Sequence, residues 1–180
     1  MEYDLIRLFD HPVNLFDFIA SAIVALGTEG TAERRIEIEW RRSASDLSNW
    51  TELLIKWDLD TIRARNPLID RQLESVRVRD ENSGRRNELA AIVVAAAVFA
   101  FVEPETRFTS VARIGTRHDY YLNDKKDEMI EIAGRDEDGL PALFEQKRAQ
   151  SNKNSRIRKR WVSVTVMRVQ PRNRTEGLHS

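Results

Sequence analysis

The stretch Asp119–Ala133, with the sequence DYYLNDKKDEMIEIA, decides the fold of this chain. It has an apolar segment at each end and a polar segment, Asn123–Glu128, between them, which is typical of two strands joined by a loop. In the second apolar segment Glu131 alternates with Ile130 and Ile132. Because successive residues of a strand point to opposite faces, we expect the isoleucines to face the core and Glu131 to face the other side of the sheet.

Outward from this hairpin, the second half of the chain predicts the order helix, three strands, helix, strand. Asn87 is expected to cap the first helix, and Pro104 prevents that helix from continuing. The predicted ranges are helix Glu88–Val102, strands Phe108–Ile114, Asp119–Leu122 and Met129–Ala133, helix Leu140–Gln150 and strand Arg160–Val169. The fold class is therefore predicted as α/β (α+β), with a mixed central sheet flanked by helices.

The first half of the chain predicts an accessory region of helices with one or two strands. The predicted elements are helix Val13–Leu26, strand Arg35–Trp40, helix Ser45–Arg65 and a short strand at Val76 and Val78. The polar stretch Asp80–Arg86 separates the two halves. This gives an N-terminal accessory region, residues 1–84, and an α/β core, residues 85–180.

Composition argues against several classes of protein. The chain has 180 residues, no cysteine, and 29 basic against 29 acidic residues, so disulfides and thiolate metal sites are excluded and the net charge is zero. No glycine-rich phosphate loop, zinc-ligand cluster or Ser-His-Asp arrangement is recognisable, which argues against nucleotide hydrolases, zinc enzymes and serine hydrolases. The first residues lack the features of a secretory or organelle signal, and the apolar run Leu89–Val102 is shorter than the roughly twenty residues of a membrane span. We expect a cytoplasmic protein with no membrane partner.

Two acidic side chains are expected to converge on one face of the sheet. Asp119 opens one strand of the hairpin, and Glu131 lies midway along the other, aimed away from the isoleucines. Converging carboxylates supply the oxygen ligands that Mg²⁺ prefers. A pair of solvated carboxylates on a one-sided sheet is the alternative interpretation.

This order of elements, together with the two acids, resembles the restriction-endonuclease-like superfamily, also called PD-(D/E)xK nucleases. The common core of that superfamily runs helix, three strands, helix, strand, and the resemblance covers only the C-terminal half of this chain. It implies that Asp119 and Glu131 bind a catalytic metal ion, Mg²⁺ or Mn²⁺. It also implies that Glu88 matches an acid that sometimes assists from the first core helix.

The lysine of the superfamily motif does not match, since the second residue after Glu131 is Ala133. Some members of the superfamily supply this lysine from the following helix. In that helix Lys147 lies four residues after Leu143 and three after Phe144, which belong to the apolar stripe, so its ammonium is expected on the sheet-facing side. The resemblance thus implies a catalytic role for Lys147 beside the two acids. A lysine that lies along the edge of an apolar face is the alternative.

A basic region covers the last part of the chain. Between Gln146 and Thr175 there are ten Lys or Arg residues and no Asp or Glu. From Lys153 through to Arg174 this region is expected to contact the backbone of a nucleic acid, which would make binding dependent on salt. The residues predicted to bind the nucleic acid are Lys153, Arg156, Arg158 and Lys159. A solvated basic surface is the alternative.

Two functions follow from these features. The first is Mg²⁺-dependent phosphodiester hydrolysis of DNA, by a nuclease or a nuclease-fold subunit of a defence or DNA-processing system. The second is a non-catalytic scaffold of the same fold in a larger nucleic-acid-processing or defence complex, with a protein partner bound through the N-terminal half. The tryptophans Trp40, Trp50 and Trp57 would favour an interface if they were exposed together. An amine of Lys147 close to both carboxylates would favour the enzyme.

Overall fold

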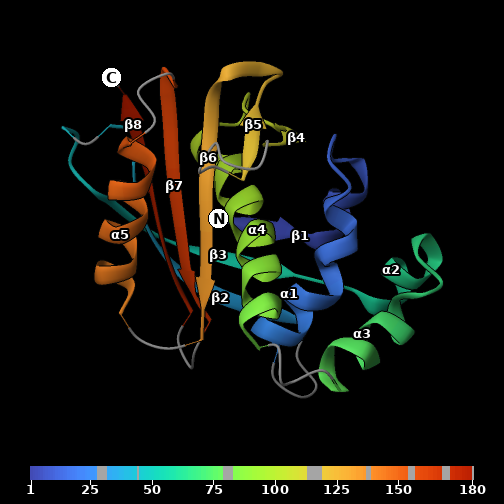
Figure 1. The fold of residues 1–180 in the computed structure, drawn as a ribbon. Helices are drawn as coiled ribbons and strands as arrows, with labels where there is room; N and C mark the ends of the chain where they lie inside the picture. Colours follow the sequence, from blue (N-terminus) through green and yellow to red (C-terminus); the bar gives the residue numbers. More distant parts are fainter. Residues whose placement is uncertain are drawn as a thin grey trace.

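The chain folds around one mixed β-sheet. A computed structural model describes residues 1–27, 32–43, 45–78, 83–112, 119–136, 139–153, 157–167 and 171–179. Within these residues the sheet has eight strands in the order β1-β3-β2-β8-β7-β6-β5-β4 (Figure 1). The strands are β1 (Glu2–Asp4), β2 (Glu33–Arg41), β3 (Asn49–Lys56), β4 (Phe108–Val111), β5 (Tyr120–Leu122), β6 (Lys125–Arg135), β7 (Lys159–Val166) and β8 (Arg172–His179). The predicted α/β class, a mixed sheet flanked by helices, is confirmed.

Helices cover both faces of this sheet. They are η1 (Leu5–Asp10), η2 (Leu15–Phe18), α1 (Ile19–Leu26), α2 (Leu59–Arg65), α3 (Ile69–Val78), α4 (Ser83–Val102) and α5 (Leu140–Asn152). On β7, Trp161 packs in the core cluster that contains α1 and α4, whereas its neighbour Val162 packs in the cluster that contains α5. Because neighbouring strand residues face opposite sides, α4 and α5 lie on opposite faces, as Figure 1 shows. Within the described residues, no helix has both the length and the apolar character needed to cross a membrane.

The hairpin that contains Glu131 is confirmed, with a tighter turn than the sequence predicts. Strands β4, β5 and β6 are antiparallel neighbours, and β6 runs parallel to β7. Only Asn123 and Asp124 form the turn, with φ of 54° and 56°. Asn and Asp are the non-glycine residues that most readily adopt a positive φ, so the backbone reverses at once and Lys125 already belongs to β6. The predicted loop Asn123–Glu128 is therefore mostly strand.

The predicted N-cap of the long apolar helix is wrong. Helix α4 begins at Ser83, and Asn87 lies within it with an exposed fraction of 1%. Gly134 of β6 crosses at this point so closely that a Cβ added to it would come within 2.0 Å of the Asn87 carbonyl oxygen. Asn87 is thus part of the helix–sheet contact, and the helix continues through the polar residues before it.

Two predictions in the first half are wrong. The range Ser45–Arg65 is not one helix, because β3 occupies its middle and α2 begins only after Asp58. Leu53 and Ile55 are buried at the period of a strand, and β3 pairs with β2 along its whole length. The Asp58 side chain accepts hydrogen bonds from the backbone of Asp60 and Thr61, which starts α2 at that residue.

The predicted short strand at Val76 and Val78 is also wrong, because both residues belong to α3. This helix buries Ile69 and Leu73, which are spaced four residues apart, and leaves Val78 exposed. The alternation of valine and arginine at its end is therefore local and does not indicate a strand.

A strand that the sequence does not predict lies at the centre of the sheet. Strand β8 runs antiparallel to β7 and parallel to β2, so it joins the two halves of the chain in one sheet. Arg172 ion-pairs with Glu37 of β2 at 3.0 Å, and Arg174 lies over the ring of Phe144 at 4.2 Å. These two arginines therefore belong to a strand of the sheet, and Arg174 also contacts α5.

Candidate functional site

Asp119 and Glu131 lie next to each other on neighbouring strands, as the sequence predicts. Asp119 immediately precedes β5, and its backbone N–H donates to the carbonyl of Ile130 at 2.8 Å. The backbone N–H of Ile132 in turn donates to Oδ2 of Asp119 at 2.6 Å. These two bonds lie on either side of Glu131 in β6, so they fix the Asp119 carboxylate beside that residue.

The Glu131 side chain faces α5. Ile130 and Ile132 pack in the cluster under α4, whereas Ala133, two residues after Glu131, packs in the cluster under α5. Glu131 itself is buried, with an exposed fraction of 3%. The alternation read from the sequence therefore gives the correct faces for Ile130, Glu131 and Ile132.

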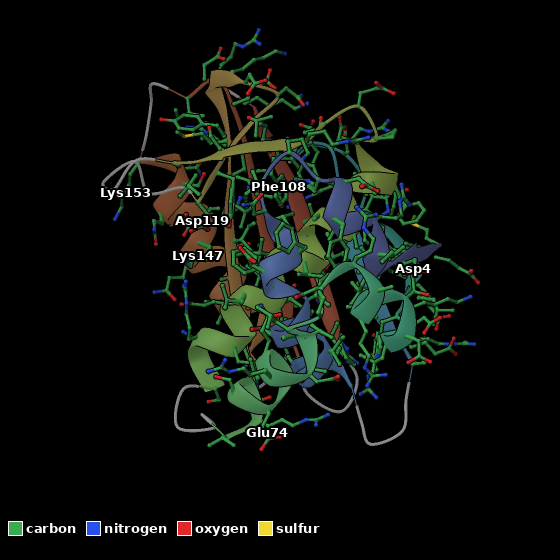
Figure 2. All side chains as sticks on the ribbon, turned by 90° about the vertical axis from the view of Figure 1, so that its right-hand side faces the viewer. Asp4, Glu74, Phe108, Asp119, Lys147 and Lys153 are labelled. Atoms are coloured by element: carbon green, nitrogen blue, oxygen red, sulfur yellow. The ribbon has the colours of Figure 1, made fainter. Side chains whose placement is uncertain are left out.

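Lys147 reaches Glu131 from α5. Its Nζ donates to Oε1 of Glu131 at 2.5 Å, and Nε2 of Gln150 donates to the same oxygen at 3.2 Å. Helix α5 holds both donors over the sheet because Leu143 and Phe144 are buried against it one turn earlier. Figure 2 shows Asp119 and Lys147 on the same side of the molecule. The predicted position of Lys147 on the sheet-facing side of its helix is thus what the structure has.

Burial controls the protonation of both acids. The pKa of Glu131 is raised to about 7, because burial and then the charge of Asp119 raise it more than the hydrogen bond and charge of Lys147 lower it. Burial also raises the pKa of Asp119, against the hydrogen bond from Ile132 and the charge of Lys147. Two buried carboxylates that repel each other are stabilised by a nearby cation. The ammonium of Lys147 is such a cation.

Glu88 is not brought into contact with these acids. Its side chain is exposed on the first half of α4 and forms an ion pair with Arg85 at 3.3 Å. Its charge still raises the pKa of Asp119, so it contributes to the local field without a hydrogen bond. In the described part of the chain, no group of three or more His, Asp or Glu side chains is placed to hold a metal ion.

Close packing surrounds Ala133, the residue at the position where the PD-(D/E)xK motif would have a lysine. Ala133 is buried in a small apolar cluster with Leu143 and Phe144 of α5 and Val164 of β7. A lysine here would have to pass its ammonium through this cluster. The amine that reaches Glu131 therefore comes from α5, one turn beyond Phe144.

The predicted nucleic-acid residues differ in their surroundings. Arg158 ion-pairs with Asp127 at 3.0 Å and Glu128 at 3.1 Å, and Lys159 lies 3.6 Å from Glu103. Lys153 is exposed at the C-terminal end of α5, and no described carboxylate pairs with it. Arg156 lies outside the described residues.

A second buried acid on this face was not found from the sequence. Glu176 of β8 is fully buried, and Val162 of β7 pairs in register with both Glu131 and Glu176. Its partners are arginines: Arg41, whose Nε donates to Oε2 at 2.7 Å, and Arg148, at 3.5 Å from Oε1. The polar alternation in RNRTEGLH, residues 172–179, was the available signal, but it lacks the apolar residues that usually identify a strand.

Comparison with known proteins identifies no protein similar to this chain. No protein-family model, no curated protein and no solved structure matches this chain.

Proposed function

We propose that this chain hydrolyses phosphodiester bonds of DNA with the help of Mg²⁺, as a nuclease or as a nuclease-fold subunit of a larger system. The observation that carries the proposal is the contact of Lys147 with Glu131 beside Asp119, across two strands and a helix. The three side chains come from residues far apart in the sequence. Each is buried or partly buried, and their charges are arranged as two anions with one cation.

The donor set fits Mg²⁺. Oδ1 of Asp119 and Oε2 of Glu131 receive no hydrogen bond from the described residues, so each acid has one oxygen available. Mg²⁺ commonly binds through only one or two carboxylates and completes its shell with waters and substrate phosphates. When bound, it would polarise the phosphate and lower the pKa of a water ligand. Asp119 and Glu131 are the residues that would hold it.

Lys147 and Gln150 supply hydrogen-bond donors on the same side. The ammonium of Lys147 forms an ion pair with Glu131 in this structure. Once the charge of Glu131 is neutralised, this ammonium can donate to an attacking water or to a phosphate oxygen that gains charge. Gln150 keeps the Glu131 carboxylate oriented through its amide.

The alternative is a non-catalytic scaffold, and one observation favours it: Lys147 already neutralises Glu131 without a metal ion. The tryptophans do not add support. Trp57 is buried, Trp40 packs partly buried against the core, and only Trp50 among these three is largely exposed, with an exposed fraction of 67%. They are not exposed together, so they form no common interface.

A plasmid-cleavage assay tests the proposal. Wild-type protein is expected to nick supercoiled DNA in Mg²⁺ and to lose this activity in EDTA. Lys147→Ala is expected to lower the rate by about 10²-fold or more, because it removes a donor aimed at the reacting group. Glu145→Ala, on the exposed side of the same helix, is the matched control and should retain activity. Absence of cleavage by the wild type, together with tight metal binding, would favour the scaffold.

A further inference from the structure

A pocket of about 240 Å³ lies away from the acids, between the N-terminal segment and the end of α4. Tyr3, Arg7 and His11 line one side, and Phe99 and Ala100 of α4 line another. It shares no lining residue with the site of Asp119, Glu131 and Lys147. Drug-sized ligands fill pockets of roughly 300–1,000 Å³, so an occupant of this pocket must be smaller.

Arg7 brings a positive charge to this pocket. Its guanidinium lies over the ring of Tyr3, 4.9 Å from the centroid, which holds the side chain in place. Among the described residues, no carboxylate forms an ion pair with it. The acid in the lining, Asp10, already pairs with Arg65 at 2.9 Å. The charge of Arg7 is therefore available to a ligand.

Arg107 and His11 add further donors. Arg107 uses Nη1 to donate to the carbonyls of Pro104 and Thr106, and its other nitrogens make no hydrogen bond to the described residues. Burial raises the pKa of the Tyr3 phenol, and the positive charges of Arg7 and Arg107 partly oppose this rise, which places both guanidinium groups near that phenol. In His11, Nδ1 accepts from the N–H of Val13 at 3.3 Å, which leaves Nε2 as the donor of the neutral ring.

The remaining lining is apolar and aromatic. Phe108 stacks edge to face with both His11 and Phe99, at centroid distances of 5.7 and 5.6 Å. Both rings are almost fully buried, with exposed fractions of 1%, so the apolar surface that the pocket presents comes mainly from Ala100 of α4 and from Pro12. The lining thus combines two guanidinium groups with a small apolar surface.

We propose that this pocket binds a small molecule with a phosphate monoester or a carboxylate at one end and a small apolar group at the other. The anionic end is placed against Arg7 and Arg107, because guanidinium forks match the geometry of phosphate and carboxylate. The apolar end lies against Ala100 and Pro12. This inference is independent of the proposed hydrolysis, since the two sites share no residue.

Calorimetry and thermal shift with simple probes test the pocket, in EDTA so that the acidic site plays no part. The probes are phenyl phosphate and benzoate, with inorganic phosphate and benzyl alcohol as controls that lack one of the two ends. We expect at least one ring-bearing anion to bind more tightly than both controls. If only phenyl phosphate binds, the ligand carries a phosphate. If benzoate binds as well, the pocket also accepts a carboxylate. Failure of both ring-bearing anions to bind overturns the inference.

Two substitutions locate the binding. Arg7→Gln is expected to lower the affinity for the probe about tenfold, because one charge-assisted contact is lost. Ala100→Leu should fill the apolar end and weaken the ring-bearing probe while the melting temperature without ligand shows that the variant is folded. The control is Arg77→Gln, an exposed arginine of α3 outside the pocket. Equal affinities in wild type, Arg7→Gln and Arg77→Gln would contradict the assignment.

Discussion

The carboxyl group of Glu131 is buried, and burial disfavours its charged form. Burial and the neighbouring Asp119 raise its pKa to about 7. An unfolded chain would release this proton near the ordinary value of about 4.3. Between these two values the folded state binds more protons than the unfolded state, so the free energy of unfolding falls as pH rises. The stability that protonated Glu131 contributes is thus present at low pH and is lost as pH rises through about 7.

We therefore predict a pH-dependent difference between wild type and Glu131→Gln. In EDTA, the free energy of unfolding of wild type relative to this variant should decrease by roughly 2–3 kcal/mol between about pH 5 and pH 8, because most of the pKa shift from about 4.3 to about 7 falls in this range. Asp119 and Lys147 face Glu131 in both proteins and contribute to both curves. Urea denaturation at a series of pH values measures the difference. A constant difference over this range would show that Glu131 keeps an ordinary pKa.

At this scale the site was largely predictable. The positions of Asp119 and Glu131 follow from a strand alternation with two isoleucines, and that of Lys147 follows from its spacing to Leu143 on a helix. Glu176 was not predictable in the same way, because its burial depends on arginines from β2, α5 and β8 itself that come together only in the folded sheet. Periodicity shows which way a side chain points, but not which distant partner meets it.

At the scale of elements, β6 and α4 approach so closely that glycine is required at their crossing. A Cβ at Gly134 would lie 2.0 Å from the backbone oxygen of Asn87 and 2.9 Å from Cβ of Ala91. Backbone atoms cannot move aside as a flexible side chain can. Gly134→Ala should therefore lower the free energy of unfolding by about 2 kcal/mol or more.

The matched control for this prediction lies on the same helix. At Gly84, in the first turn of α4, an added Cβ meets nothing within 4 Å. Gly84→Ala should leave stability unchanged or raise it by about 0.5–1 kcal/mol, since alanine favours a helix over glycine. Thermal and urea unfolding of both variants measures the contrast. Equal stability of the two variants would mean that the two elements are farther apart.

The basic segment between α5 and β7 gives a second prediction at this scale. Lys153 has no described carboxylate partner, whereas the charge of Arg158 is balanced by Asp127 and Glu128. If the segment contacts DNA, Lys153→Ala should weaken binding and reduce the slope of log K against log salt by about one. Arg158→Ala should change that slope less, because its counterion release is already limited by the two acids. The opposite order in a salt titration would show that Arg158 leaves its acids to bind DNA.

Apart from β8, the elements of the second half could be predicted because each has one clear apolar pattern. The range Ser45–Arg65 could not, because its Leu and Trp residues fit helical spacing while the burial of Leu53 and Ile55 depends on pairing with β2. Strand β8 carries asparagine, threonine and glutamate at buried positions, where Asn173 donates to the hydroxyls of Ser163 and Thr165. These polar side chains of β8 find their hydrogen-bond partners only when β7 lies beside the strand.

At the scale of the whole molecule, we predict from the order of strands in the sheet that the two halves of the chain fold as one unit. Strand β8 pairs with β2 on one side and β7 on the other, and the main core cluster contains residues of α1, β2, α4 and β7. A fragment of residues 83–180 would leave β8 as an edge strand and uncover α4. We expect the full chain to show coincident unfolding by tryptophan fluorescence and circular dichroism, and the fragment to show no cooperative transition. A cooperative fragment would support an independent core.

The central claim is that Asp119 and Glu131 hold one divalent cation between them, and calorimetric titration with Mn²⁺ tests it most directly. The titration is done at about pH 8, where Glu131 is ionised, because its pKa is raised to about 7. Asp119→Ala and Glu131→Ala should each remove most of the binding, and the double variant should lose little more, since groups that act as one unit are not additive. Lys147→Ala should leave Mn²⁺ binding intact. Wild-type affinity in both single acid variants would contradict the shared site and the proposed function with it.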